Sequence, residues 1–446
     1  MSTELLAPLD LAFWHLESDA HPMHLGALAV FDPSPDLGGE QILDLLADRA
    51  ADIPRLRMRV RDVWLPVGGA AWVTHKEFDV RRHVRHVRLG AGNFAGRAVD
   101  LAGELMERPL RRGRPPWEMY VLTGAPEEPF AVLVKLHHAL ADGMRAVAIG
   151  AGILDQMADS RAGGSRRHRP VASKSWLPGP GQVADLAKGR VEELGRALGI
   201  GASVMRASRL ELGASSALAA SSSGTRRLAT AVLDLEDVQR VRRASGGTAN
   251  DVLLALTAGA LRRWMLERGD RLPGADPRAL VPVSRRRPGS PPGSGNKLSA
   301  YLLGLPVSED DPEARLQAVR TAMDRNKSAG PARGAGAVAV LADQLPSLAH
   351  RFGAPLAGNA ARMLFDILVT SVPLPRSALS FGGRPLREIY PMAPLARGQS
   401  LAVALSTYGG RVHVGLVADG RAVPDADRLA DCMGEELHDL LKVIGP

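Results

Sequence analysis

The pattern of apolar residues along the chain predicts buried strands followed by packed helices. Residues 24–31 have strand character, and residues 130–136 form an apolar run rich in Val and Leu, as a buried strand does. Directly after this run, residues 143–157 place apolar side chains three and four positions apart, which is the spacing of an amphipathic helix. Residues 137–142 therefore connect a buried strand to a packed helix, a place where proteins often hold functional side chains.

The second half of the chain has a similar pattern. Asn250 precedes a segment with apolar residues at helical spacing, so it is well placed to cap the N-terminus of a helix. Residues 401–407 and 411–417 are β-rich runs on either side of Tyr408-Gly409-Gly410, and two glycines between such runs are a good hairpin signal. Strands and helices alternate in both halves, which predicts a mixed α/β fold.

The composition changes in the middle of the chain. Residues 160–181 are rich in Ser, Arg, Gly and Pro, and residues 214–225 are rich in Ala and Ser, which is typical of linkers. We therefore expect a first half over residues 1–158, a crossover over 159–224 and a second half over 225–446.

The overall composition excludes several classes of protein. The chain has 446 residues, of which 45% are apolar and 23% charged, as in globular proteins. A single cysteine cannot form an internal disulfide, and the acidic N-terminal segment lacks the features of an export signal, so we expect a cytoplasmic protein. The net charge of +8 suits an anionic membrane surface or a phosphate-bearing ligand, whereas the 4% of scattered aromatics disfavours nucleic acid.

The strongest local feature is the sequence His137-His138-Ala139-Leu140-Ala141-Asp142-Gly143. Imidazole can take up and return a proton near neutral pH, and two adjacent histidines point in different directions. A buried carboxylate at Asp142 needs a cationic or hydrogen-bond donor partner, for which an Arg elsewhere in the chain is the obvious group. Gly143 permits a positive φ or the close approach of a ligand.

Other kinds of site have weaker support. A His-His pair at a strand end can be simply a polar loop. A metal site would need further ligands, and His83 and His86 lie in an Arg-rich stretch that we interpret as a solvated surface. No G-x-S-x-G motif occurs and Cys432 has no motif around it, so a covalent acyl-enzyme is unsupported.

The H-H-x-x-x-D-G pattern resembles the active-site motif of the CoA-dependent acyltransferase superfamily. Further segments resemble, in order, those of bacterial wax ester synthase/diacylglycerol acyltransferases. The segments that carry this resemblance are Pro8-Leu9-Asp10, residues 13–17, residues 22–26, Pro115-Pro116-Trp117-Glu118, Asn250-Asp251-Val252, residues 281–284, Asn296 and residues 401–419.

The resemblance implies two chloramphenicol-acetyltransferase-like halves with an active-site tunnel between them. It implies that His138 is the general base, that His137, Asp142 and Gly143 shape the loop, and that no metal or cofactor is needed beyond acyl-CoA as co-substrate. The acceptor hydroxyl would attack the thioester directly. Further candidates for contact with substrate or with the developing oxyanion are Asn250, Thr370, Ser371 and Trp117.

The chain departs from the family pattern at the segment that the family typically shows as S/T-N-V-P-G-P. Here residues 370–375 are Thr-Ser-Val-Pro-Leu-Pro, with Ser371 in place of an amide and Leu374 in place of a glycine. Asp366 stands where Asn is usual, and Pro116 replaces the Leu of P-L-W. These departures leave the acceptor and the acyl-chain specificity open.

The leading hypothesis is an acyl-CoA-dependent O-acyltransferase that makes wax esters or triacylglycerol from long-chain substrates. An enzyme that acylates a non-lipid hydroxyl or amine, and a non-catalytic lipid- or CoA-binding protein, are the alternatives. The protein would work in the cytoplasm or at the inner face of a membrane or on a lipid droplet. In this hypothesis, residues 182–212 could form a membrane-facing helix and Arg285 to Arg287 could hold CoA phosphates.

Overall fold

The structure is a computed structural model. It describes residues 3–64, 67–156, 218, 222–284, 298–329 and 365–445. The expected linker at 160–181, the segment 182–212, Arg285 to Arg287, Asn296 and most of 214–225 lie outside the described residues.

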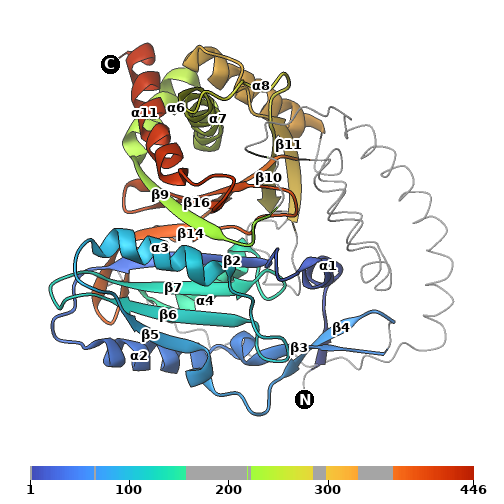
Figure 1. The fold of residues 1–446 in the computed structure, drawn as a ribbon, viewed down its shortest axis with the longest axis vertical. Helices are drawn as coiled ribbons and strands as arrows, with labels where there is room; N and C mark the ends of the chain where they lie inside the picture. The colour runs from blue at the N-terminus through green and yellow to red at the C-terminus, as the bar shows by residue number, and fades with distance from the viewer. Residues whose placement is uncertain are drawn as a thin grey trace.

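The first half of the molecule is built on a seven-stranded sheet in the order β5-β6-β7-β2-β14-β13-β8. Helix α2 packs on β5 and β6, while α3 lies on the opposite face, between this sheet and the second one (Figure 1). Helix α4 follows β7 and contacts α2. The elements are β2 (His24–Phe31), α2 (Gly39–Ala51), β5 (Val84–Arg88), α3 (Phe94–Glu107), β6 (Trp117–Thr123), β7 (Phe130–His137), α4 (Gly143–Ile153), β8 (Asp155–Gln156), β13 (Leu379–Phe381) and β14 (Arg384–Met392).

The second half is built on a six-stranded sheet in the order β11-β10-β12-β15-β16-β9. Among the described residues, the helices α6, α7, α8 and α11 cover it and share a continuous apolar core with its strands (Figure 1). The elements are β9 (Arg226–Asp234), α6 (Leu235–Ser245), α7 (Ala249–Glu267), β10 (Arg278–Ser284), β11 (Leu298–Gly304), α8 (Pro312–Ala329), β12 (Ile367–Val372), β15 (Leu401–Tyr408), β16 (Arg411–Asp419) and α11 (Ala426–Ile444).

A small third sheet, β1 (Thr3–Leu5), β4 (Ala70–Thr74) and β3 (Met58–Asp62), lies beside helix α1 (Pro8–Leu16) at one side of the first half. Two 3-10 turns, η1 (Pro54–Arg57) and η2 (Val80–Arg82), complete the described elements of this half. Figure 1 shows β3 and β4 projecting from the body of the molecule.

The two halves of the molecule approach each other closely where α3 meets β9. A Cβ added at Gly103 of α3 would lie 3.1 Å from the Arg226 carbonyl oxygen and 3.0 Å from the Leu228 nitrogen. Glycine therefore lets α3 touch the backbone of the other half, and the two halves share one apolar cluster there.

The structure confirms several expected elements. The first predicted strand is β2 with the same bounds, the second is β7, and the hairpin is formed by β15 and β16. Gly409 and Gly410 both have positive φ, which a two-residue hairpin turn requires. The mixed α/β prediction is also confirmed.

Other expectations were wrong. Asn250 does not cap α7: Thr248 does, because its hydroxyl accepts from the Asp251 N–H while the Asp251 carboxylate accepts from the Thr248 N–H. His83 is not on a solvated surface but buried, stacked on Trp117 and donating from Nδ1 to its carbonyl oxygen at 2.9 Å. Cys432, by contrast, agrees with its sequence interpretation, because no motif surrounds it and it is buried in α11.

The first sheet is not built from the first half of the sequence alone. Strands β13 and β14 come from the second half, and β14 pairs along β2 in antiparallel register. Among the described helices, none is long and apolar enough to cross a membrane.

Candidate active site

The connection from β7 to α4 is fixed by backbone hydrogen bonds. The His138 N–H donates to the Met23 carbonyl at 2.8 Å, and the Leu140 N–H donates to the His137 carbonyl at 2.8 Å. Asp142 is the N-cap of α4, where its Oδ1 accepts from the Arg145 N–H at 2.8 Å. This cap stabilises the helix start that follows the two histidines.

The two histidines have different environments. His137 is fully buried, and its Nδ1 accepts a hydrogen bond of 2.9 Å from the Ala139 N–H. The proton of the neutral ring is therefore on Nε2, which faces Glu17 Oε1 at 3.4 Å. His138 instead lines a cavity. The loop thus holds one imidazole inside the protein and offers the other to a ligand.

Glu17 is the centre of a buried polar cluster behind His137. Its Oε1 lies 3.4 Å from Nε2 of both His137 and His24, and its Oε2 lies 3.4 Å from Arg112. Burial tends to raise the pKa of Glu17, but the two histidines together lower it well below its usual range. Burial lowers the pKa of His24 to about 4, although Glu17 opposes this shift. The carboxylate is therefore ionised at neutral pH and lies against the protonated Nε2 of His137. The neutral His24 ring carries its proton on Nδ1, which donates to the Met106 carbonyl at 3.3 Å.

Helix α1 covers the loop that carries His137 and His138. Phe13 stacks on His138 with ring centroids 4.1 Å apart, and Trp14 packs on His137 at 5.0 Å. Burial lowers the pKa of His138 to about 4. At neutral pH His138 is therefore uncharged, which is the form that can accept a proton from a substrate.

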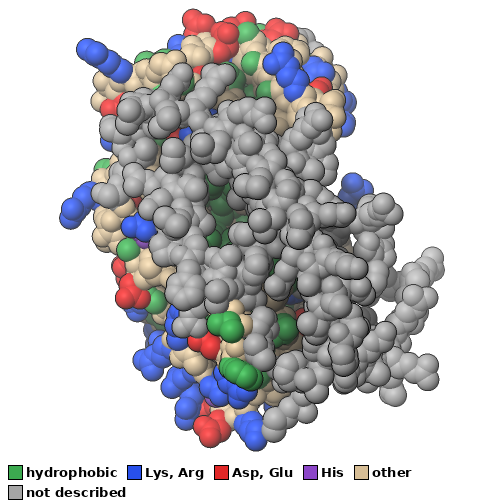
Figure 2. All heavy atoms as spheres, turned by 90° about the vertical axis from the view of Figure 1, so that its right-hand side faces the viewer, with side chains coloured by type: hydrophobic (Ala, Val, Ile, Leu, Met, Phe, Trp, Pro, Cys, Tyr) green, Lys and Arg blue, Asp and Glu red, His purple; other side chains and the backbone are tan. Residues whose placement is uncertain are grey.

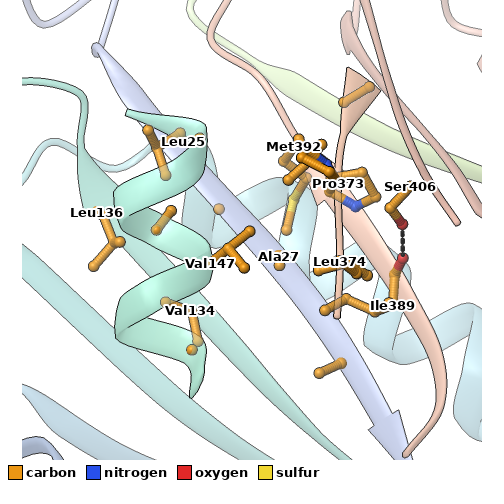
Figure 3. Close-up of a pocket in the computed structure, with 18 of the residues that line it drawn as sticks. Leu25, Ala27, Val134, Leu136, Val147, Pro373, Leu374, Ile389, Met392 and Ser406 are labelled. Atoms are coloured by element: carbon orange, nitrogen blue, oxygen red, sulfur yellow. Dashed lines mark hydrogen bonds between the residues drawn. The ribbon is translucent and has the colours of Figure 1, made fainter. Parts of the chain in front are cut away.

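The cavity beside His138 has a volume of about 380 Å³ and lies between the two halves. Figure 3 shows Val134 and Val147 on one wall, facing Leu374, Ile389 and Met392 on the other. The cavity follows β2 from Leu25, next to the histidines, to Phe31. These six steps of about 3.3 Å give a length of about 20 Å.

Few polar groups line this cavity. They are His138, Thr370, Ser371 and Ser406, and the Ser406 hydroxyl donates to the Ile389 carbonyl at 3.0 Å (Figure 3). An apolar cavity with a few polar groups at defined points is the usual form of a binding site for a largely hydrocarbon ligand. A neutral imidazole at one end could deprotonate a hydroxyl bound there.

Apart from Trp117, the sequence candidates divide into two groups. His138, Gly143, Thr370 and Ser371 line the cavity, and Asn250 is joined to them because its Oδ1 accepts a 2.8 Å hydrogen bond from the Ser371 hydroxyl. His137 and Asp142 are buried at the two ends of the loop and do not line the described cavity.

Two candidates are corrected. Trp117 is fully buried in the core of the first half, where its indole N–H donates to the Leu56 carbonyl at 2.7 Å, so it does not line the described cavity. Gly143 begins α4 without a positive φ, and an added Cβ would meet no atom within 4 Å. It therefore leaves open space at the cavity wall and serves no turn.

Among the described residues, one group of side chains has the spacing of metal ligands: Glu267, Cys432 and Glu435. Arg428 already pairs with both carboxylates, at 2.6 and 2.5 Å. Burial raises the pKa of the Cys432 thiol to about 11, which disfavours the thiolate that a metal would bind. These residues fit a structural ion-pair cluster better than a metal site.

Glu17, His24 and Phe13 are the site residues that sequence reasoning missed. The pairing of His24 with His137 depends on the register of β2 and β7. The position of Glu17 depends on how the end of α1 packs over that pair. The segments containing all three residues carry the family resemblance, which was the one available signal.

Comparisons with known proteins extend over the whole chain. The catalytic domain of the wax ester synthase/diacylglycerol acyltransferase family matches residues 6–253, and its C-terminal domain matches residues 294–441. A protein of Mycobacterium tuberculosis strain H37Rv, named as a probable diacylglycerol O-acyltransferase, is 33% identical over 442 residues, which cover 95% of this chain and 93% of that protein.

Two solved structures show the same fold. A wax ester synthase/diacylglycerol acyltransferase from Marinobacter aquaeolei VT8 aligns with a TM-score of 0.72 at 21% identity, covering 99% of this chain and 100% of that one. A mutant starter condensation domain of rhizomide synthetase, solved in complex with C8-CoA, aligns with a TM-score of 0.57 at 14% identity, covering 98% and 95%. The two-half architecture implied by the resemblance is thereby confirmed. The chain belongs to the wax ester synthase/diacylglycerol acyltransferase family and is an acyltransferase of that family.

Proposed function

We propose that the protein transfers a long-chain acyl group from acyl-CoA to the hydroxyl of a fatty alcohol or a diacylglycerol, with His138 as general base. The observation that carries the proposal is the neutral, cavity-facing His138 at one end of a long apolar cavity. The acyltransferase activity of the family supplies the reaction class.

In the proposed reaction the acceptor hydroxyl gives its proton to the His138 imidazole as its oxygen attacks the thioester carbonyl. The resulting tetrahedral intermediate collapses by breaking the carbon–sulfur bond, and the CoA thiolate takes the proton from the imidazolium. General-base catalysis of this kind contributes about 10²–10⁴-fold, and the joint binding of two substrates adds more. No covalent acyl-enzyme is formed.

The developing oxyanion needs hydrogen-bond donors. Thr370 and Ser371 line the cavity, and Asn250 is held against Ser371. Because Oδ1 of Asn250 accepts from Ser371, its amide would donate through Nδ2. We assign Thr370 and the Asn250 amide as the candidate donors, with Ser371 holding that amide in place. We assign to His137 and Asp142 the role of holding the loop.

The length of the cavity favours a long acyl chain as the transferred group. A carbon–carbon bond of about 1.5 Å advances an extended chain by about 1.25 Å, so a cavity of about 20 Å holds about sixteen carbons. The C8-CoA complex of a condensation domain with this fold and the excess of basic residues support acyl-CoA as donor. We further propose the division at residues 158 and 225, a cytoplasmic location and a peripheral position at a lipid surface.

A second candidate function is acylation of a non-lipid hydroxyl or amine. It is favoured by Leu374 and Ser371, which both line the cavity and replace the glycine and the amide usual in the family. Leu374 narrows the space available on the second half's side of the cavity.

The test measures thiol release from acyl-CoAs of different length, with fatty alcohol, diacylglycerol or no acceptor. His138→Ala should abolish acceptor-dependent release, whereas the control His75→Ala, which lies outside the cavity, should retain it. Release that persists in His138→Ala would refute the assigned base. Tight acyl-CoA binding without transfer to any acceptor would favour the non-catalytic alternative.

A further inference from the structure

The tip of the small sheet exposes apolar side chains that the fold does not use. Trp64 is 83% exposed, Val67 57% and Leu5 45%, which places them among the most exposed large apolar side chains of the described residues. Asp62 pairs with Ala70 at the last rung before the β3–β4 turn, and Leu5 pairs with Ala71 one rung away. All three side chains therefore belong to the same end of the sheet, which we call the hairpin tip. A single exposed apolar residue needs no explanation, but three at one end of a sheet, one of them a tryptophan, do.

Basic side chains follow β3 toward the hairpin tip, with Arg61 one rung and Arg59 three rungs from its last pair. Arg61 is exposed on β3, and Arg59 donates to the Gly113 carbonyl at 3.1 Å, which brings the loop containing Arg111 and Arg114 alongside the strand. Both Arg59 and Arg114 help lower the pKa of His75, after burial, so their charges lie close together. Figure 2 views the molecule from the right-hand side of Figure 1. In its lower part, at the height where Figure 1 places the β3–β4 hairpin, hydrophobic side chains lie next to basic ones.

We propose that the hairpin tip docks on a phospholipid surface that carries anionic head groups, with Trp64 and Val67 in the interface and the flanking arginines on the head groups. Tryptophan is enriched at the boundary between hydrocarbon and water, and arginines beside it gain from anionic lipid. Charge complementarity selects this partner over a neutral surface.

The hairpin tip is connected to the catalytic loop through one helix. His15 of α1 donates from Nε2 to the Gly68 carbonyl in the β3–β4 turn at 3.3 Å, and Phe13 of the same helix stacks on His138. Docking would therefore hold the lipid surface near helix α1, which covers His138. This consequence rests on the proposed function, because it requires a lipid acceptor or product.

The experiment is flotation of the full chain with vesicles of phosphatidylcholine alone or mixed with phosphatidylglycerol. The native protein should float with the anionic vesicles, less so at high salt. The double variant Trp64→Ser, Val67→Ser should lose at least tenfold in recovery, and Arg61→Glu should lose mainly the preference for anionic lipid. The control Leu266→Ser removes a 49% exposed apolar side chain from α7 and should float like the native protein.

Equal flotation of the double variant and the native protein would overturn the proposal, as would failure of the native protein to float with any vesicle. Acyl transfer to a water-soluble short-chain alcohol should be unchanged in the double variant. This result would show that the double variant is folded. His138→Ala should still float. Flotation without any acyl transfer by the native protein would therefore refute the proposed function and leave docking intact.

Discussion

Replacing Glu17 by Gln tests whether its charge holds the catalytic loop. The substitution keeps the shape of the side chain and one carbonyl acceptor but removes the negative charge that faces His24, His137 and Arg112. A contact to a charged group is worth about 1 kcal/mol more than a contact to a neutral one, and Arg112 is half exposed and adds little. We expect the free energy of unfolding at pH 7 to fall by about 2 kcal/mol.

The contribution of Glu17 to the free energy of unfolding should depend on pH. The folded-state pKa of Glu17 is lowered below its value of 4.5 in the unfolded chain. Its contribution to stability is therefore fully present above pH 4.5 and is lost as the pH falls below it. One pH unit corresponds to about 1.4 kcal/mol, so the difference between native protein and variant should shrink by roughly that amount between pH 5.5 and 3.5.

Urea denaturation at several pH values measures this difference. The matched control is Glu104→Gln, whose carboxylate is 61% exposed and pairs with Arg108 at 3.8 Å, and it should change stability by less than about 0.5 kcal/mol. Because Glu17 positions His137 without lining the cavity, the variant should lose about tenfold in kcat with little change in KM. A Glu17→Gln protein as stable and active as the native one at pH 7 would refute this reasoning.

The acid limb of the pH profile of kcat/KM should lie near pH 4 rather than 6.5, because burial lowers the pKa of His138 to about 4 and only the neutral ring accepts a proton. An acid limb at pH 6.5, in enzyme that recovers full activity on return to pH 7, would contradict the burial of this ring. Leu374→Gly should shift the preference toward bulkier chains in competition between acyl-CoAs, at a cost of about 1–3 kcal/mol in stability, and an unchanged preference would place Leu374 outside the path of the chain. Thr248→Ala should lower stability by about 0.5–2 kcal/mol through loss of the capping box. Asn250→Ala should leave the unfolding midpoint almost unchanged and lower kcat by up to about 10², and the reverse result would return Asn250 to a structural role.

The elements predicted correctly are those whose signal is local. Apolar runs define β2 and β7, and Gly409-Gly410 defines the β15–β16 turn, because strand content and positive φ depend on neighbouring residues alone. The helix cap was misassigned by two positions. Thr248 and Asn250 can both cap a helix, and the deciding contact is the reciprocal one between Thr248 and Asp251.

The missed features depend on contacts between distant segments. Glu17 belongs to the site only because α1 packs over the pairing of His24 with His137, more than one hundred residues apart in the chain. The insertion of β14 beside β2 likewise has no local signal. Trp117 was placed at the substrate by motif likeness, whereas its indole N–H is satisfied in the core. A motif identifies which segments matter but does not say which side chains face the substrate.

The pairing of β2 with β14 also bears on how the protein is made. One edge of β2 stays without its partner strand until Met392 has been synthesised, about 360 residues after the end of β2 at Phe31. At a synthesis rate of about 5–20 residues per second, this edge waits for about 20–70 s. During that time the nascent chain presents an unpaired apolar strand to its surroundings, so chaperone contact during translation should matter more for this protein than for one whose first sheet is complete early. A chain truncated before β13 should accumulate in inclusion bodies, however intact its catalytic loop.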